Sequence, residues 1–178
     1  MMDFFTHLFL PIAVVYVLRS ELFEHPLAFA LAGFAILPDA DKIVAVPGGL
    51  HSVVTLLPIA LIVVLVERGV AGRLRYAPVA IALLYSHLLI DVIDGNFMVL
   101  FAPLLETGIQ LGYPGDVVLG GKWPVVIQGE LLSVSIREPQ PVPGGRGGPG
   151  TYAFLKKYGV LSMLVFVLVV SPRFTGDG

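Results

Sequence analysis

A histidine and two aspartates lie inside an apolar segment of the chain. The segment reads SHLLIDVIDGNFMVLFAP over residues 86–103 and carries His87, Asp91 and Asp94. On a helix, His87 and Asp91 share one face because they are four residues apart, and Asp94 follows on roughly that face. Burying such groups without partners is costly. A metal ion, a buried ion pair or a proton path would each supply the missing partners.

Further histidines and aspartates occur close to the ends of other apolar runs. His7 lies near the N-terminus, Asp39 and Asp41 lie in the sequence LPDAD, and His51 begins the sequence HSVVT. Imidazole nitrogens and carboxylate oxygens are ligands for zinc, and also for manganese or iron. Because the chain has no cysteine, any metal must be held by histidine and carboxylate side chains.

The composition is that of a membrane protein. Hydrophobic residues make up 56% of the 178 residues and charged residues only 13%, whereas a soluble domain is typically about a quarter charged. We therefore expect a protein of the cell (plasma) membrane with the lipid bilayer as its partner. The net charge of −2 gives no indication of a nucleic-acid partner.

Five apolar runs predict membrane-spanning helices, which makes the expected fold an all-α bundle of about five transmembrane helices. The runs cover residues 4–18, 27–37, 53–66, 76–93 and 158–170, with Pro38 ending the second and 97–105 forming an apolar continuation or a re-entrant piece. The first run lacks a basic start and a cleavage pattern, so we expect a membrane helix rather than a signal peptide.

The chain divides into three parts on this interpretation. Residues 1–105 form a helical domain that carries the candidate site, and 158–178 form the last helix with a short tail. Between them, 106–157 are rich in glycine and proline and predict an extramembrane loop, with a flexible stretch at 139–150. Its segments DVVL, WPVVI and LLSVSI favour strands, so this loop could hold a small β-hairpin.

The alternating direction of consecutive spans brings the candidate residues to one side of the membrane. His7 starts the first helix, Asp39 and Asp41 follow the second, His51 precedes the third, and His87 and Asp91 lie late in the fourth. The other side collects four arginines: Arg19, Arg68, Arg73 and Arg75. Short loops rich in arginine face the cytoplasm, so we expect a multi-pass protein whose polar cluster lies on the non-cytoplasmic side.

The motifs over residues 1–105 resemble a known family. A histidine near the N-terminus, LPDAD, HSVVT and SHLLID, in that order, resemble the YdjM-like membrane proteins, to which metal-dependent hydrolase activity is ascribed. That family is in turn distantly similar to the helical fold of zinc-dependent phospholipase C and P1 nuclease. The resemblance implies a divalent metal held by six residues: His7, Asp39, Asp41, His51, His87 and Asp91.

The chain departs from the family pattern at two places. The middle motif of the family has two histidines, whereas here only His51 is present; Leu56 could occupy the second position, or His51 and Ser52 could match the second half of the motif. Asp94 stands near the place where the family often has a threonine. One ligand of the family is therefore missing or replaced.

Three functions remain open. The first is a membrane hydrolase in which a metal-activated water attacks a phosphoester or lipid-linked substrate, with Asp94 as a candidate general base or orienting group. The second is a non-catalytic protein whose metal joins helix ends, and the third is a proton- or ion-coupled transporter that uses the His/Asp cluster. Without a metal, LPDAD could be an ordinary capped turn, and His87 with Asp91 a structural pair.

Overall fold

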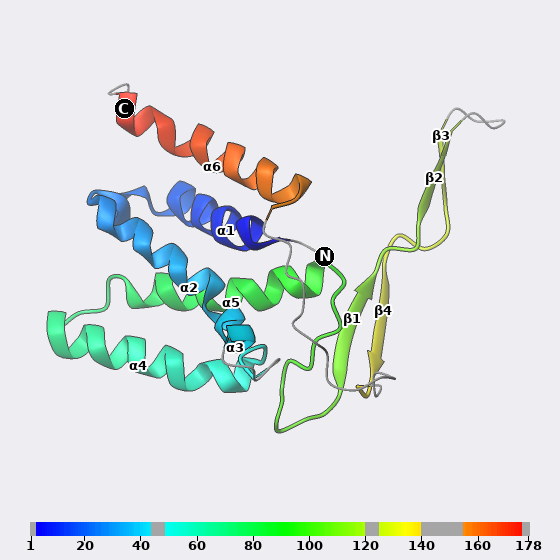
Figure 1. Ribbon diagram of the computed structural model, residues 1–178, viewed down its shortest axis with the longest axis horizontal. Coiled ribbons are helices and arrows are strands. Elements are labelled where there is room, and N and C mark those ends of the chain that lie inside the picture. Colours follow the sequence, from blue (N-terminus) through cyan, green and yellow to red (C-terminus); the bar gives the residue numbers. More distant parts are fainter. Residues whose placement is uncertain (1–2, 44–48, 120–124, 140–154, 176–178) are drawn as a thin grey trace.

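The first and last helices lie side by side (Figure 1). The computed structural model describes residues 3–43, 49–119, 125–139 and 155–175. Helix α1 (Phe4–Leu18) begins at Asp3, whose Oδ1 accepts hydrogen bonds from the backbone N–H of Thr6 at 2.9 Å and from its hydroxyl at 3.1 Å. Oδ2 of Asp3 accepts the N–H groups of Lys156 and Gly159 at the start of α6 (Lys157–Thr175). One buried carboxylate therefore caps α1 and fixes α6 beside it.

A run of short helices replaces the single second helix that the sequence predicts. Its members are η1 (Ser20–Phe23), η2 (Pro26–Ala32), α2 (Gly33–Ile36), η3 (Leu37–Asp39) and α3 (Ala40–Ile43), where η denotes a 3-10 helix. The prediction that Pro38 ends the run is wrong, because Pro38 lies in the first turn of η3, where a missing backbone N–H costs little. The run therefore continues through Asp39 and delivers it to the end of the bundle.

Helices α4 (Val53–Ala71) and α5 (Ala77–Ile93) form an antiparallel pair joined by a short connection (Figure 1). Ser52 caps α4 by accepting the N–H of Val54 at 3.1 Å, and the left-handed Gly72 (φ 67°) ends it. The carboxylate of Glu67 accepts the N–H groups of residues 75, 76 and 77 at 2.9, 2.8 and 2.5 Å, which caps α5. Both ends of the connection are therefore fixed by hydrogen bonds.

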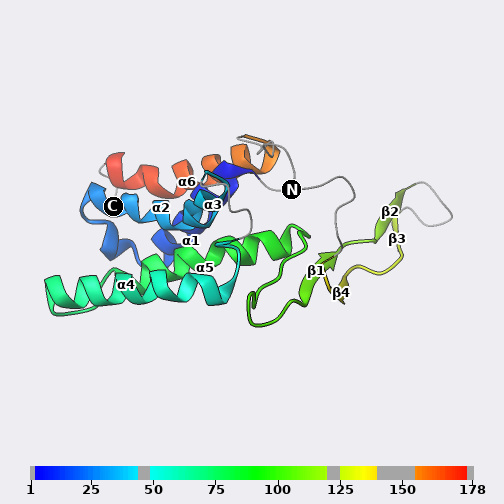
Figure 2. The ribbon, with the colours of Figure 1, turned by 60° about the horizontal axis from the view of Figure 1, so that its bottom comes forward.

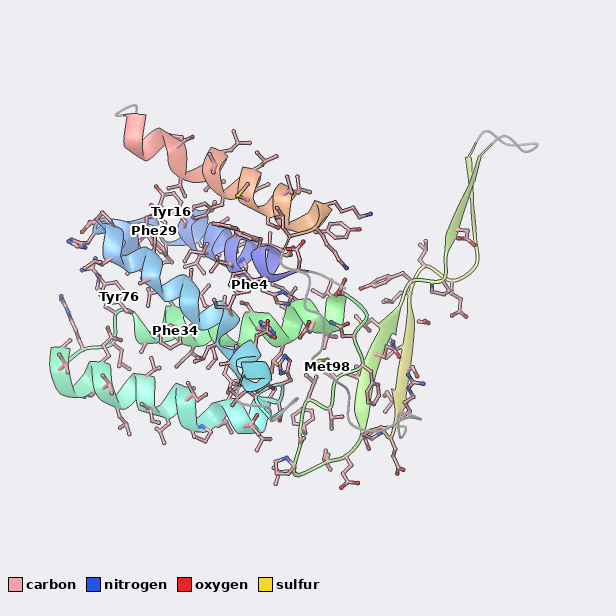
Figure 3. The ribbon with its side chains drawn as sticks, viewed as in Figure 1. Phe4, Tyr16, Phe29, Phe34, Tyr76 and Met98 are labelled. Carbon is pink, nitrogen blue, oxygen red and sulfur yellow. The ribbon has the colours of Figure 1, made fainter. Side chains whose placement is uncertain are left out.

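Two apolar clusters hold the helices together. The first joins α1, η1, α2 and α5 through Ile12, Phe23, Ala35, Val79 and Leu83. Aromatic rings extend it at one end, where Tyr16 and Phe29 stack with their centroids 6.0 Å apart (Figure 3). The second cluster joins α4, α5 and the chain after α5 through Leu56, Leu84, Leu88 and Met98. Helix α5 contributes to both clusters, so it is the central element of the bundle.

A two-part β-ribbon extends beyond the end of α5 (Figures 1 and 2). Strand β1 (Gly108–Gly112) pairs with β4 (Ser133–Arg137), and β2 (Asp116–Leu119) pairs with β3 (Val125–Gln128), both antiparallel. The hairpin allowed for by the sequence is therefore present, and β1 is an additional strand. Residues 97–105, expected to continue the helix or re-enter the membrane, instead form turns and one β-bridge between Met98 and Ile109. Trp123 and most of 139–150 lie outside the described residues.

The outer surface of the helices is apolar. Exposed leucines, isoleucines and valines lie along α4 and α6, including Leu61, Ile62 and Val70 on α4. Among the described residues, α4 alone is long and apolar enough to cross a bilayer, with 19 residues that span about 28 Å. The apolar helices Phe4–Leu18, Pro26–Asp39, Ala77–Ile93 and Lys157–Pro172 are shorter. The structure therefore shows a mostly helical protein with one clear candidate span.

Candidate metal centre

Five of the candidate side chains meet at one end of the helical bundle. His7 lies in the first turn of α1, Asp39 ends η3, and His51 lies in the turn before α4. His87 and Asp91 occupy the last two turns of α5. The structure thus brings together residues from four separate segments, as the alternating direction of the helices predicts.

Backbone carbonyls orient two of the three histidine rings. Nδ1 of His7 lies 3.1 Å from the carbonyl oxygen of Asp3, and Nδ1 of His87 lies 2.8 Å from that of Ala35. A carbonyl oxygen only accepts, so both Nδ1 atoms carry the proton and donate it. In the neutral rings this leaves the Nε2 lone pairs directed into the cluster, which is the tautomer that a metal ligand requires.

Asp41 orients the third ring. Its Oδ2 accepts a hydrogen bond from Nδ1 of His51 at 2.9 Å and one from the backbone N–H of Leu50 at 3.2 Å. This contact is on the side of the ring that faces away from the other histidines, since Nε2 of His51 approaches Asp39. The sequence predicts Asp41 as a metal ligand, but its position favours an orienting role behind His51.

Four contacts between Nε2 atoms and carboxylate oxygens lie between 3.3 and 3.5 Å, and one further contact, from His51 to Asp91, is longer at 3.8 Å. The distance is 3.4 Å from His7 to Asp91 and 3.4 Å from His87 to Asp91. It is 3.3 Å from His51 to Asp39 and 3.5 Å from His87 to Asp39. These values exceed the usual hydrogen-bond range of about 2.7–3.2 Å. They match the separation of about 3.3–3.6 Å between ligands that lie about 2.0–2.2 Å from a tetrahedral ion.

The ligand atoms form two overlapping groups of three. One contains His7, His87 and Asp91, and the other contains Asp39, His51 and His87. His87 belongs to both, and its Nδ1 is bonded to Ala35, so only its Nε2 could bind a metal, and only one ion at a time. Asp91 directs Oδ1 toward His7 and Oδ2 toward His87 and His51, at 3.4, 3.4 and 3.8 Å.

The residues present fit a divalent cation. His7 and His87 are 2% and 1% exposed, and no hydrogen bond from the described residues reaches Nε2 of His7. Oδ1 of buried Asp41 likewise accepts none from them. With the imidazoles neutral, the carboxylates would give the cluster a net negative charge, which burial makes costly. A cation at the centre would both pair with the orphaned nitrogen and neutralise that charge.

The carboxylates around His51 change its proton affinity. Burial lowers the pKa of the His51 imidazole, but hydrogen bonds with Asp39 and Asp41 and the negative charge of Asp41 outweigh burial. The pKa is therefore raised above its ordinary value. A metal ion must displace the proton that these aspartates help to hold.

Two residues that support the site have no metal-ligand signature in the sequence. Asn96 donates a hydrogen bond from its side-chain amide to Oδ1 of Asp91 at 2.8 Å. The backbone carbonyl of Asp3 accepts one from Nδ1 of His7 at 3.1 Å. Asn96 follows Gly95 at the end of α5 and suggests only a helix end. Asp3 lies four residues before His7, a spacing that fits a first-turn contact, but the sequence offers no reason to expect a backbone contact there.

Asp94 is the predicted residue that the structure places apart from the ligand groups. It caps the C-terminus of α5, with its backbone N–H donating to the carbonyl oxygen of Ile90 at 2.8 Å. Its side chain is half-buried, and it belongs to neither group of candidate ligands. Its suggested role as a general base stays a prediction.

The structure is that of a mostly helical protein with one candidate membrane span among its described residues and a cluster of histidine and aspartate side chains that could hold a metal ion. A family model described as YdjM inner membrane protein matches residues 2–173. The chain belongs to this family, so its location is a membrane. No curated protein and no solved structure matches the chain.

Proposed function

We propose that the chain is a membrane-embedded, metal-dependent hydrolase. One observation carries the proposal: Nε2 atoms of three buried or nearly buried histidines converge with carboxylate oxygens at separations that suit metal ligands better than hydrogen bonds. The ligands in this proposal are His7, Asp39, His51, His87 and Asp91. Their mixture of imidazole and carboxylate favours Zn²⁺, with Mn²⁺ or Fe²⁺ as alternatives.

The chemistry of such a site is hydrolysis. Held by these five residues, a zinc ion would supply hydroxide at neutral pH, because it would lower the pKa of a bound water toward ~7. The protein's part is to hold the ligands rigidly: backbone carbonyls fix His7 and His87, Asp41 orients His51, and Asn96 holds Asp91. Asp94, at the end of α5, is the candidate general base.

A phosphoester or lipid-linked substrate suits the location of the site. The ligands gather at the ends of apolar helices rather than along their length, and His51, Asp39 and Asp91 retain 13%, 10% and 12% side-chain exposure. A substrate head group could therefore approach from the aqueous side while its apolar part stays in the bilayer. By the distribution of the arginines, this side is the non-cytoplasmic one.

Metal analysis of the full chain, purified in detergent without chelators, tests the site. We expect about one equivalent of zinc, manganese or iron, lost in His87→Ala and Asp91→Ala and retained in His25→Ala, whose histidine lies outside the cluster. Hydrolysis of a generic phosphodiester and of a phospholipid by the same samples then tests the activity. A metal-free parent protein, or variants as active as the parent, would overturn the proposal.

A metal without catalysis is the second candidate function. The five ligands come from α1, η3, the turn before α4, and α5, so one ion would join four segments of the chain. A protein that melts at a lower temperature after chelation, yet hydrolyses none of the substrates with metal bound, would favour this structural role.

A further inference from the structure

A continuous groove lies at the end of the bundle opposite the ligand cluster. One hollow of about 510 Å³ is bounded by α2, α4 and α5, and a second of about 440 Å³ adjoins η2. Leu31, Phe34 and Tyr76 belong to the walls of both, and Figure 3 labels the last two. Because Tyr76 precedes α5 and His87 lies ten residues after Ala77, the end of the groove at the start of α5 is about 15 Å from His87 along that helix.

The walls of this groove are apolar. Helix α4 presents Ile62, Val66 and Val70 to it, and these side chains are 58%, 59% and 86% exposed. Phe34 and Leu31 form the facing wall. An apolar chain lying here would cover surface that the fold leaves open, which is favourable in proportion to the area buried.

Two arginines stand at the polar end of the groove. Arg73 and Arg75 both line it, together with Glu67. Arg75 donates to the carbonyl of Glu21 at 3.1 Å and lies 3.8 Å from the exposed carboxylate of Glu24. Arg73 attracts Glu67 electrostatically.

Glu67 offsets only one of the two positive charges at this end. Its two oxygens accept the three N–H groups at the start of α5, so the carboxylate is already paired with that helix terminus. The donors of the helix terminus are likewise in use. A ligand anion would therefore bind the guanidinium groups of Arg73 and Arg75, which suit phosphate oxygens.

We propose that this groove binds an anionic phospholipid, with an acyl chain along the α2–α4 walls and the phosphate at Arg73 and Arg75. The groove combines an apolar channel with a cationic end, and a phospholipid has the complementary pairing of acyl chain and anionic head. Phospholipid also surrounds any protein that lies in a membrane, so this ligand is present at high concentration. This site is separate from the metal centre and does not depend on the proposed hydrolase activity.

A melting-temperature titration of the full chain in non-ionic detergent tests the proposal. Phosphatidylglycerol is compared with phosphatidylcholine of identical acyl chains, and with inorganic phosphate alone. We expect phosphatidylglycerol to bind about fivefold or more tightly than phosphatidylcholine, since each basic residue near an anionic head group contributes roughly that factor. Inorganic phosphate should have no effect at equal concentration.

Three variants separate this site from general surface charge. Arg73→Gln should remove most of the preference for phosphatidylglycerol, and Arg73→Lys should retain part of it and guard against misfolding. Arg68→Gln is the matched control, because Arg68 lies on the same end of α4 but does not line the groove. Val66→Trp, which fills the channel, should weaken both lipids alike. Equal binding of the two lipids by the parent, equal losses in Arg73→Gln and Arg68→Gln, or stabilisation by phosphate alone would overturn the proposal.

Discussion

Oδ2 of Asp41 accepts a hydrogen bond of 2.9 Å from Nδ1 of His51. Across the same ring, Nε2 of His51 lies 3.3 Å from Oδ1 of Asp39. Asp41 is itself only 1% exposed and is held by the backbone N–H of Leu50. Asp41 thus holds the His51 ring on its Nδ1 side, and this contact fixes the direction in which Nε2 points into the cluster.

We expect Asp41→Ala to weaken metal binding by about 10- to 100-fold, the usual effect of losing an orienting partner behind a histidine ligand. Competition with a chelator of known affinity measures the change. Asp41→Asn, which keeps an oxygen for Nδ1, should lose less. Asp94→Asn is the control, because Asp94 belongs to neither ligand group. Unchanged affinity in Asp41→Ala would show that His51 needs no support or is not a ligand.

His87→Ala should cause the largest loss of metal among single substitutions. His87 is the one residue common to both ligand groups, so its removal leaves each of them with two members. We expect a loss greater than the one caused by Asp41→Ala, and also greater than that of His7→Ala, which affects one group. Metal content after dialysis ranks the three variants. If His7→Ala and His87→Ala were equal, the two groups would not share a nitrogen as the structure indicates.

The sequence is sufficient to predict which end of each helix carries the site. Consecutive apolar segments that alternate in direction are expected to place His7, Asp39, His51 and His87 at one end, and the structure brings these residues close together. The sequence also predicts the hairpin, because β-branched segments separated by turn residues favour strands.

The sequence does not predict which residues of the candidate site face the cluster and which ones orient them. Asp39 and Asp41 are equivalent in LPDAD, but the structure places Asp39 in the cluster and Asp41 behind His51. Asn96 lies just after the end of α5 and holds Asp91 through its side chain. Asp3 orients His7 through its backbone carbonyl. The contact from Asp3 cannot be recognised in the sequence, because every residue has a backbone carbonyl. The contact from Asn96 depends on the path of the chain after α5, which the sequence does not specify.

Gly159→Ala should destabilise the protein by about 1–3 kcal/mol, as overpacking of a filled site does. A Cβ at this position would collide with the carboxylate of buried Asp3. Because the carbonyl of Asp3 also receives His7, the metal affinity should fall as well. Thermal unfolding and the chelator competition measure the two effects.

Gly69→Ala supplies the comparison for this substitution. Gly69 lies within α4, and a Cβ there would have no atom within 4 Å. Alanine should therefore stabilise the helix by about 0.5–1 kcal/mol. A Gly159→Ala protein as stable as the parent would mean that α1 and α6 can separate at little cost, contrary to the close contact seen at Asp3.

The metal-free and metal-bound proteins should respond to pH in opposite directions. In the metal-free protein the pKa of His51 is raised by Asp39 and Asp41. The resulting stabilisation is complete below the ordinary pKa of about 6.5 and is lost as the pH rises through the higher folded-state value. Metal binding instead needs a neutral imidazole, so the stabilisation by zinc should grow with pH over the same range. Melting temperatures with zinc and with a chelator, from about pH 5.5 to 8.5, measure both trends. His51→Gln should reduce both, and a metal-free parent whose pH dependence equals that of His51→Gln would contradict the coupling of His51 to the two aspartates.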